Sequence, residues 1–145
     1  MLNEKEGLMV EAVEVIGLNL KWAFWSTFKR YSRPLKEFGL TPMQFFILAM
    51  LWKNEGSSQQ KIADDSFCDK STVVHLIDKL EEAGLVWRSP APEDRRMYRL
   101  FLSPKAKELY PEAAKRVAEV DRELKERFAE TELQAFGKVL KGLRQ

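Results

Sequence analysis

The strongest constraint on the fold lies between residues 57 and 84, where two short stretches of helical period follow one another. Ser57 or Ser58 can cap the first stretch, Asp69 can cap the second, and Gly84 can end it. The side chains expected to point inward are Ile62, Ala63, Val73, Ile77 and Leu80. Two short helices joined by a tight turn predict a helix-turn-helix.

The chain changes its period directly after this pair of helices. Residues 85–88 and 97–102 are rich in β-branched and aromatic side chains. The loop between them, residues 89–96, is polar and contains Pro90 and Pro92. This pattern predicts a β-hairpin that follows the helix-turn-helix as a wing.

A long helical pattern before this region is apolar on two faces. One face carries Val13, Ile16, Leu20, Phe24, Phe28 and Tyr31, and the other carries Leu18, Trp22 and Trp25. We expect Pro34 and then Gly39 to close this helix. A short chain has little of its own to cover a helix from two directions, so the pattern indicates a partner subunit.

The next helix has a clear beginning. Thr41 can cap it, Pro42 suits its first turn, and Gln44 completes a capping box. Its expected buried side consists of Phe45, Leu48, Ala49 and Trp52, and its expected end is at residues 54–56.

Two more helices are predicted after the wing. Ser103 and Pro104 open a long one, which Pro111 is expected to kink. Its apolar positions, Ala106, Tyr110, Ala113, Val117, Val120, Leu124 and Phe128, form a seven-residue repeat of the kind that packs along another helix. Thr131 and Gln134 are a capping-box candidate for the last helix, which carries the apolar stripe Leu133, Phe136, Leu140 and Leu143.

Composition excludes several classes of protein. With 45% hydrophobic and 32% charged residues, the 145-residue chain suits one globular unit. No apolar run approaches the roughly 18 residues that cross a bilayer, and the first residues do not resemble a signal peptide, so we expect a cytoplasmic protein. Cys68 and His75 are the only residues of their kinds. We therefore expect no internal disulfide and no structural zinc site. We also predict no cofactor.

Four sequence motifs occur in a distinctive order. They are Leu40-Thr41-Pro42-Met43-Gln44-Phe45, Lys70-Ser71-Thr72-Val73, the run from Leu76 to Val86, and Pro92-Glu93-Asp94-Arg95-Arg96 followed by Leu102-Ser103. In this order and spacing they resemble the MarR family of winged helix-turn-helix transcriptional regulators. The resemblance covers nearly the whole chain, and its most specific part is Asp94-Arg95-Arg96 placed just after the recognition-like helix.

The resemblance implies a mainly α fold with a small β-hairpin wing. It implies a winged helix-turn-helix DNA-binding domain at residues 36–103 and a helical dimerisation region at residues 1–35 and 104–145. It also implies a homodimer that binds double-stranded DNA at partly palindromic operators. Such a protein is usually a repressor that a small ligand or oxidation releases.

The segment at residues 69–83 is the expected recognition helix, whose N-terminal side chains would face base edges in the major groove. Its expected DNA-binding residues are Lys70, Ser71, Thr72, Val74, His75 and Lys79. Ser71 can hydrogen-bond to a base, Val74 can touch a thymine methyl group, and His75 can reach a guanine or a phosphate. Lys70 and Lys79 are expected to neutralise phosphates.

The family often has threonine and arginine at the positions of Val74 and His75, so this helix has less hydrogen-bonding power. A solvated helix face is the alternative interpretation.

The wing has two adjacent arginines at its tip, Arg95 and Arg96. Guanidinium groups enter narrow A·T-rich minor grooves, and we expect Arg96 to do so with Arg95 as its neighbour. The resemblance implies that Asp94 holds the wing arginine in place. The alternative is a charged loop that only solubilises the protein. Six basic residues between Asp69 and Arg99 are matched by six acidic ones, so the charge is patterned.

Two further groups of residues have open roles. Cys68 lies where the family usually has an apolar residue, and the family's oxidant-sensing thiols lie in the first helix, so we expect a structural role rather than redox sensing. The family's ligand cavity would lie near Trp22, Trp25, Phe28, Phe45, Phe46 and Trp52. These aromatic residues could bind a small aromatic or amphipathic effector, or they could be ordinary core.

The sequence can be interpreted as one of three classes of protein. The leading interpretation is a DNA-binding transcriptional regulator, and the alternative is a winged-helix protein-interaction module without DNA binding. An enzyme comes last, because the sequence has no glycine-rich phosphate loop and no nucleophile and base pair around His75. We therefore predict no catalytic residues.

Overall fold

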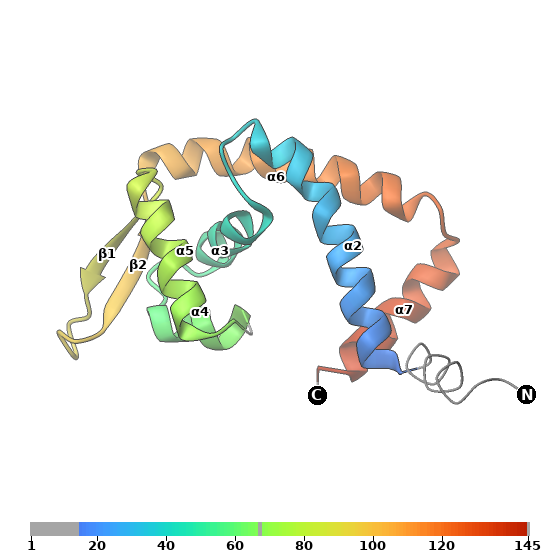
Figure 1. Cartoon of the computed structure of the whole chain (residues 1–145), viewed down its shortest axis with the longest axis horizontal. Coiled ribbons are helices and arrows are strands. Elements are labelled where there is room, and N and C mark those ends of the chain that lie inside the picture. Colours follow the sequence, from blue (N-terminus) through green and yellow to red (C-terminus); the bar gives the residue numbers. More distant parts are fainter. Residues whose placement is uncertain (1–14, 67, 145) are drawn as a thin grey trace, which may run out of the picture.

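The computed structural model describes residues 15–66 and 68–144 and is mainly α-helical with one β-hairpin. In chain order the elements are α2 (Ile16–Lys36), α3 (Pro42–Lys53), α4 (Gln59–Ser66), α5 (Lys70–Glu82), β1 (Val86–Pro90), β2 (Tyr98–Leu102), α6 (Pro104–Lys125) and α7 (Glu130–Gly142). Figure 1 shows α3, α4, α5 and the hairpin gathered into one lobe, while α6 leads from this lobe to the side where α7 lies. The predicted fold class is confirmed. Val13 of the first predicted helix lies outside the described residues.

Side-chain caps fix where the helices begin. The Thr41 N–H donates to Gln44 Oε1 at 2.8 Å, and the Gln44 N–H donates to Thr41 Oγ1 at 3.2 Å, which completes the predicted capping box. The side chains of Ser58, Asp69 and Ser103 each accept the backbone N–H three residues later, at 3.0, 2.9 and 3.1 Å respectively. Ser58, and not Ser57, therefore caps α4.

The end of α2 differs from the prediction. The helix continues through Pro34 to Lys36, and the missing N–H of Pro34 leaves unmade the backbone hydrogen bond to the Arg30 carbonyl. The chain then turns at Gly39, whose φ of 67° lies in the left-handed region that glycine adopts readily. Gly39 thus ends this segment, and Pro34 does not.

The buried face of α3 also differs from the prediction. The buried residues are Ile47, Leu48 and Leu51, whereas Trp52 is 47% exposed. Nearly every residue of α3 is apolar, so the hydrophobic period does not single out one face. Packing against α5 and α6 selects the face instead.

The last helix starts earlier than predicted. It begins at Glu130, and the Glu132 carboxylate accepts the Ala129 N–H at 2.8 Å. Acidic side chains in a first turn are favoured by the positive end of the helix dipole. Thr131 and Gln134 therefore lie inside the helix, and the predicted capping box between them does not form.

The hairpin pairs β1 with β2 in antiparallel register, from Val86 opposite Leu102 to Pro90 opposite Tyr98. Ser89 and Pro90 therefore belong to a strand rather than to the predicted loop, whereas Leu85 and Met97 lie outside the strands that were predicted to include them. The Ala91 N–H donates to the Met97 carbonyl at 2.8 Å and closes the base of the wing tip.

The core lies where α3, α4, α5 and the wing meet the first half of α6. Its most buried residues are Leu35, Ile47, Leu48, Leu51, Ile62, Val73, Ile77, Leu80, Leu100, Ala106 and Ala113. Leu35, Ala106 and Ala113 come from outside residues 36–103, so the core extends over both borders of the predicted DNA-binding domain. The division into two regions stays a prediction. No helix in the described part of the chain is long and apolar enough to span a membrane.

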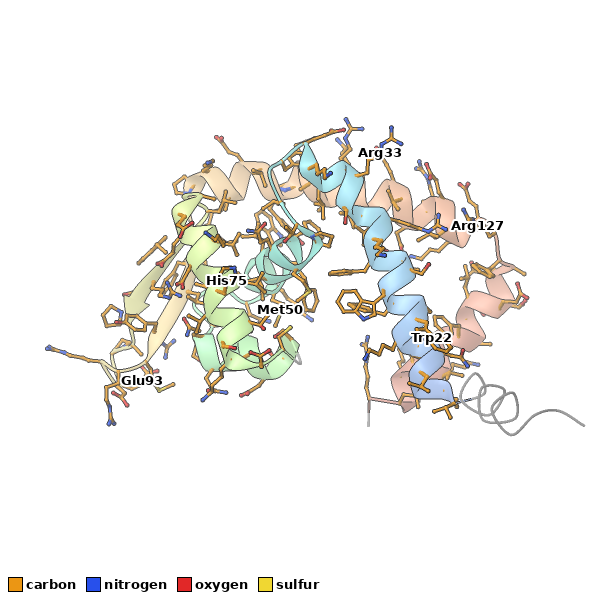
Figure 2. All side chains as sticks on the ribbon, viewed as in Figure 1. Trp22, Arg33, Met50, His75, Glu93 and Arg127 are labelled. Carbon is orange, nitrogen blue, oxygen red and sulfur yellow. The ribbon has the colours of Figure 1, made fainter. Side chains whose placement is uncertain are left out.

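The opposite side of the molecule leaves large apolar side chains exposed. Trp22 is 54% exposed and Trp25 is 49% exposed on α2, and Phe136 is 52% exposed on α7. No residue of α7 is buried. Figure 2 shows Trp22 on the part of α2 that lies away from the lobe containing His75.

Candidate nucleic-acid interface

Helix α5 has one buried face and one exposed face. Val73, Ile77 and Leu80 point into the core. The predicted DNA-binding residues Lys70, Ser71, Thr72, Val74, His75 and Lys79 are all exposed. The sequence pattern therefore identified the outward face of this helix.

The Asp69 cap orders the first turn of α5. Its carboxylate accepts the Thr72 N–H at 2.9 Å and the Thr72 hydroxyl at 2.7 Å, and it also accepts the Ser71 hydroxyl. These hydrogen bonds, led by the one from Ser71, hold the pKa of Asp69 far below its ordinary value. Because the Ser71 proton is engaged, its hydroxyl presents lone pairs outward and suits a base amino group.

At the wing tip, Asp94 holds Arg96 through backbone and side chain. Asp94 Oδ1 accepts the Arg96 backbone N–H at 2.9 Å, and the two carboxylate oxygens accept the guanidinium Nε and Nη2 at 3.2 Å each. The Arg96 hydrogen bonds lower the pKa of Asp94. The Arg96 side chain is nevertheless 91% exposed, so the pair fixes the base of the arginine and leaves its charge at the surface.

Most basic side chains between residues 69 and 99 are paired with acidic ones. Arg88 pairs with Asp78 and Glu81, Lys79 pairs with Glu82, Arg96 pairs with Asp94, and Arg99 pairs with Glu93. Among residues 15–66 and 68–144, Lys70 and Arg95 make no ion pair. The basic side chains of this region without an ion pair therefore lie at the start of α5, where Lys70 follows the Asp69 carboxylate, and at the wing tip, where Arg95 lies.

A hollow of about 330 Å³ brings the start of α5 and the wing together. Its lining includes Ser58 and Gln60 of the α4 start, Lys70 and Val74 of α5, and Arg96 and Tyr98 of the wing. Of the predicted DNA-binding residues, Ser71, Thr72, His75, Lys79 and Arg95 do not line it. A hollow with a cation on either side suits a phosphate backbone, and the α4 start adds hydrogen-bonding side chains.

Gln60 and Tyr98 line this hollow and are not among the residues predicted to bind DNA. Gln60 is the second residue of a capped helix, where side chains commonly lie near a helix N-terminus, and this position was the signal available for it. Tyr98 is predicted only as part of a strand, and nothing in the sequence indicates that it lines the same hollow as Lys70.

A second hollow, of about 310 Å³, lies between α2, α3 and α6. Its apolar lining includes Phe28, Tyr31, Leu35, Phe45, Phe46 and Val117. Asp121 is the one charged residue among those that line it. Three of the six aromatic residues predicted for a ligand cavity, Phe28, Phe45 and Phe46, thus come together here.

The other three predicted aromatic residues do not line this hollow. Trp22 and Trp25 are exposed on α2. Trp52 stacks on Tyr110 with ring centroids 4.9 Å apart. The sequence could not separate these residues from the lining because all six have similar helical spacing.

The polar wall of the second hollow was not predicted. The Tyr31 hydroxyl donates to Asp121 Oδ1 across a long 3.4 Å, and Lys125 Nζ lies 2.5 Å from Asp121 Oδ2. Burial raises the pKa of Tyr31, and the neighbouring Asp121 charge raises it further, so the phenol stays protonated. A signal was available, since Asp121 follows Val117 by one helical turn and is adjacent to Val120 of the apolar seam of α6.

Cys68 lies half-buried against the core, and its thiol donates to the Ser66 carbonyl at 3.6 Å. In the described part of the chain, no cluster of three or more His, Cys, Asp or Glu residues could hold a metal ion.

Comparison with known proteins adds independent information. The MarR family sequence model matches residues 40–98. The chain is 32% identical over 109 residues to YkoM, an uncharacterized HTH-type transcriptional regulator of Bacillus subtilis (strain 168), with 70% of this chain and 71% of YkoM covered.

Similar structures include two of the transcriptional repressor CouR. CouR bound to a 23-mer DNA duplex has a TM-score of 0.83 and 30% identity, covering 94% of this chain and 97% of that chain. CouR bound to p-coumaroyl-CoA has a TM-score of 0.81 and 28% identity, covering 93% and 95%. The likeness therefore extends over the winged lobe and the flanking helices.

Proposed function

The chain belongs to the MarR family of DNA-binding transcriptional regulators, and we propose that it is a repressor that binds a pseudo-palindromic operator as a homodimer. Members of this family and the relatives of this chain are transcriptional regulators, not enzymes. Because such a regulator must reach DNA, we propose that the protein is located in the cytoplasm.

One observation carries the proposed mode of DNA binding. Lys70 and Val74 of α5 line the same hollow as Arg96 of the wing, so one DNA strand can pass between helix and wing. In this arrangement α5 enters the major groove, Arg96 reaches the adjacent minor groove, and Lys70 neutralises a phosphate. The DNA-bound CouR structure, which is similar over nearly the whole chain, supports this proposal.

The exposed apolar faces of α2 and α7 support the homodimer. Trp22, Trp25 and Phe136 are about half exposed in the single chain, and a partner would remove them from water. Two winged lobes related by a twofold axis would read two half-sites of opposite direction.

The second hollow supports release of DNA by a small ligand. Aromatic walls favour a flat ring, and the Asp121 carboxylate at one side accepts a hydrogen bond from a phenol or an amine. CouR has been solved with p-coumaroyl-CoA, which carries an aromatic group of this kind. We propose a small aromatic effector with a hydrogen-bond donor on its ring.

A gel-shift of the full chain against its own upstream region tests the central proposal. A retarded band that unlabelled scrambled duplex fails to displace is the expected result. If every duplex bound equally weakly, the protein-interaction interpretation would take precedence.

The effector proposal has a separate test. p-Coumaroyl-CoA, 4-hydroxycinnamate and unsubstituted cinnamate are added to the preformed DNA complex of the wild-type protein and of Asp121→Asn. Release by the hydroxylated compounds, weakened in Asp121→Asn, is expected. Equal release by cinnamate would show that the ring donor is not recognised. The matched control Glu119→Gln changes a carboxylate of the same helix that does not line the hollow.

A further inference from the structure

Arg88 connects three elements of the winged lobe. From β1 its Nε donates to Gln59 Oε1 of α4 at 3.1 Å, and its Nη2 donates to Asp78 Oδ1 of α5 at 2.6 Å. Its Nη1 donates to Glu81 Oε2, while the Arg88 backbone N–H donates to Glu81 Oε1 at 3.0 Å. All three guanidinium nitrogens therefore have partners within the protein.

We propose that Arg88 is a positioning residue that holds recognition helix α5 and the wing at the relative angle needed for DNA binding, without contacting DNA itself. The side chain is only 17% exposed, whereas that of Arg96 is 91% exposed. This inference rests on the proposed use of α5 and the wing as the DNA-contacting surface.

The two acids that bind Arg88 are otherwise unfavourable where they are. Asp78 and Glu81 place negative charge on the helix that approaches phosphates, and like charges repel. Their geometry accounts for their presence, because Asp78 and Glu81 both lie on α5 and converge on one guanidinium of β1. A planar guanidinium offers several donors in a fixed geometry and can bind two carboxylates at once.

This arrangement predicts the sign of a charge-removal experiment. If Glu81 only repels DNA, Glu81→Gln tightens DNA binding. If Glu81 holds α5 through Arg88, the same change weakens DNA binding despite the lost repulsion. Glu82 is the matched control, because it lies next along α5, is exposed, and pairs with Lys79 at 2.8 Å rather than with Arg88.

The experiment uses full-length protein and fluorescence anisotropy. The probe is a duplex that the wild-type protein selects from a random library, with a scrambled duplex of the same composition for comparison. Affinities are measured at several salt concentrations for Glu81→Gln, Glu82→Gln, Arg88→Met and Arg88→Lys. Thermal melts give the folded fraction of each variant, so that affinity refers to folded protein.

Misplaced base contacts should cost about five- to a hundredfold in affinity for the selected duplex and much less for the scrambled one. Glu81→Gln and Arg88→Met are expected to show this loss with an unchanged salt slope, because no phosphate contact is removed. Arg88→Lys should recover part of it, since lysine can pair with one carboxylate. Glu82→Gln should bind as tightly as wild type or more tightly.

Three results would overturn the inference. The first is tighter DNA binding by Glu81→Gln. The second is a salt slope reduced by about one unit in Arg88→Met, which would indicate a phosphate contact. The third is wild-type affinity of Glu81→Gln and Arg88→Met for the selected duplex once the affinity is corrected for the folded fraction. A wild-type protein that selected no duplex would contradict the proposed function as well, whereas these three results contradict this inference alone.

Discussion

Arg96 and the first turn of α5 differ in what they can touch, so their substitutions should differ in kind. Arg96→Ala should weaken A·T-flanked duplexes most and lower the salt slope by about one unit.

Ser71→Ala or His75→Ala should cost about 1–3 kcal/mol on the selected site and spare random DNA. Lys70→Ala should act almost equally on all sequences. Binding isotherms at several salt concentrations separate these cases, and an unchanged salt slope in Arg96→Ala would mean that the wing does not engage DNA.

The Asp69 cap should give a pH-dependent contribution to stability. Its pKa is lowered in the folded protein, so the stabilisation is complete above the unfolded pKa, near 4, and is lost as pH falls further toward the folded value. We expect Asp69→Ala to melt about 2–8 °C lower than wild type at pH 7 and at pH 5, with a smaller difference at pH 3. Circular dichroism melts at these three pH values measure it. A difference that shrank between pH 7 and pH 5 would argue against the cap as its source.

Cys68 should behave as a structural residue. Its thiol is half-buried and donates to the Ser66 carbonyl, so we expect hydrogen peroxide to leave the DNA complex intact. The comparison is a peroxide titration of DNA-bound wild type and Cys68→Ser. Release of wild type alone would identify Cys68 as a redox sensor.

At the scale of elements, the ring of Tyr110 joins α6 to α3. It stacks on Phe45 with centroids 5.4 Å apart and on Trp52 at 4.9 Å. Tyr110→Ala should therefore lower the free energy of unfolding by about 2–4 kcal/mol, and Trp52→Ala by about 0.5–1.5 kcal/mol. Urea unfolding measures both.

Tyr110→Phe is the control for this prediction. It keeps both ring contacts, so we expect a change within about 0.5 kcal/mol of wild type. A loss as large as that of Tyr110→Ala would mean that the hydroxyl, and not the stacking, stabilises the contact between α3 and α6.

Elements with local signals could be predicted from the sequence. Thr41, Asp69 and Ser103 cap their own helices, and Gly84 ends α5, so these boundaries depend only on neighbouring residues. The face of α3 could not be predicted in the same way. An almost uniformly apolar helix is oriented by the elements around it, which is why Trp52 was wrongly expected inside.

In the candidate interface, too, the features made by neighbouring residues could be predicted and those made by distant residues could not. The exposed side of α5 follows from helical period, and the Asp94 and Arg96 contact spans only two residues. The Arg88 cluster joins Gln59, Asp78 and Glu81, which are separated by up to 29 residues, and no local pattern indicates it. The sequence analysis includes Arg88 only as the last residue of the first predicted strand, residues 85–88.

At the scale of the molecule, the exposed apolar faces predict that the chain is an obligate homodimer. Sedimentation equilibrium at micromolar concentration should give twice the mass of the chain. Phe136→Glu should dissociate the dimer and abolish tight operator binding, because each half-site alone gives few contacts. The control Glu126→Lys also changes charge on an exposed residue and should leave the dimer intact. A folded wild-type monomer would contradict the prediction.

Helix α6 connects the winged lobe to the side of the molecule proposed to dimerise. It continues through Pro111, and its 22 residues span about 33 Å. Such a helix works as a lever. With its fulcrum at one end, a tilt of about 5° displaces the other end by roughly 3 Å, which is close to the rise of one base pair. The second hollow lies against the C-terminal half of this helix, where Val117 and Asp121 line it. A ligand bound there would need to tilt α6 only slightly. The tilt would shift each winged lobe relative to its half-site by about one base pair.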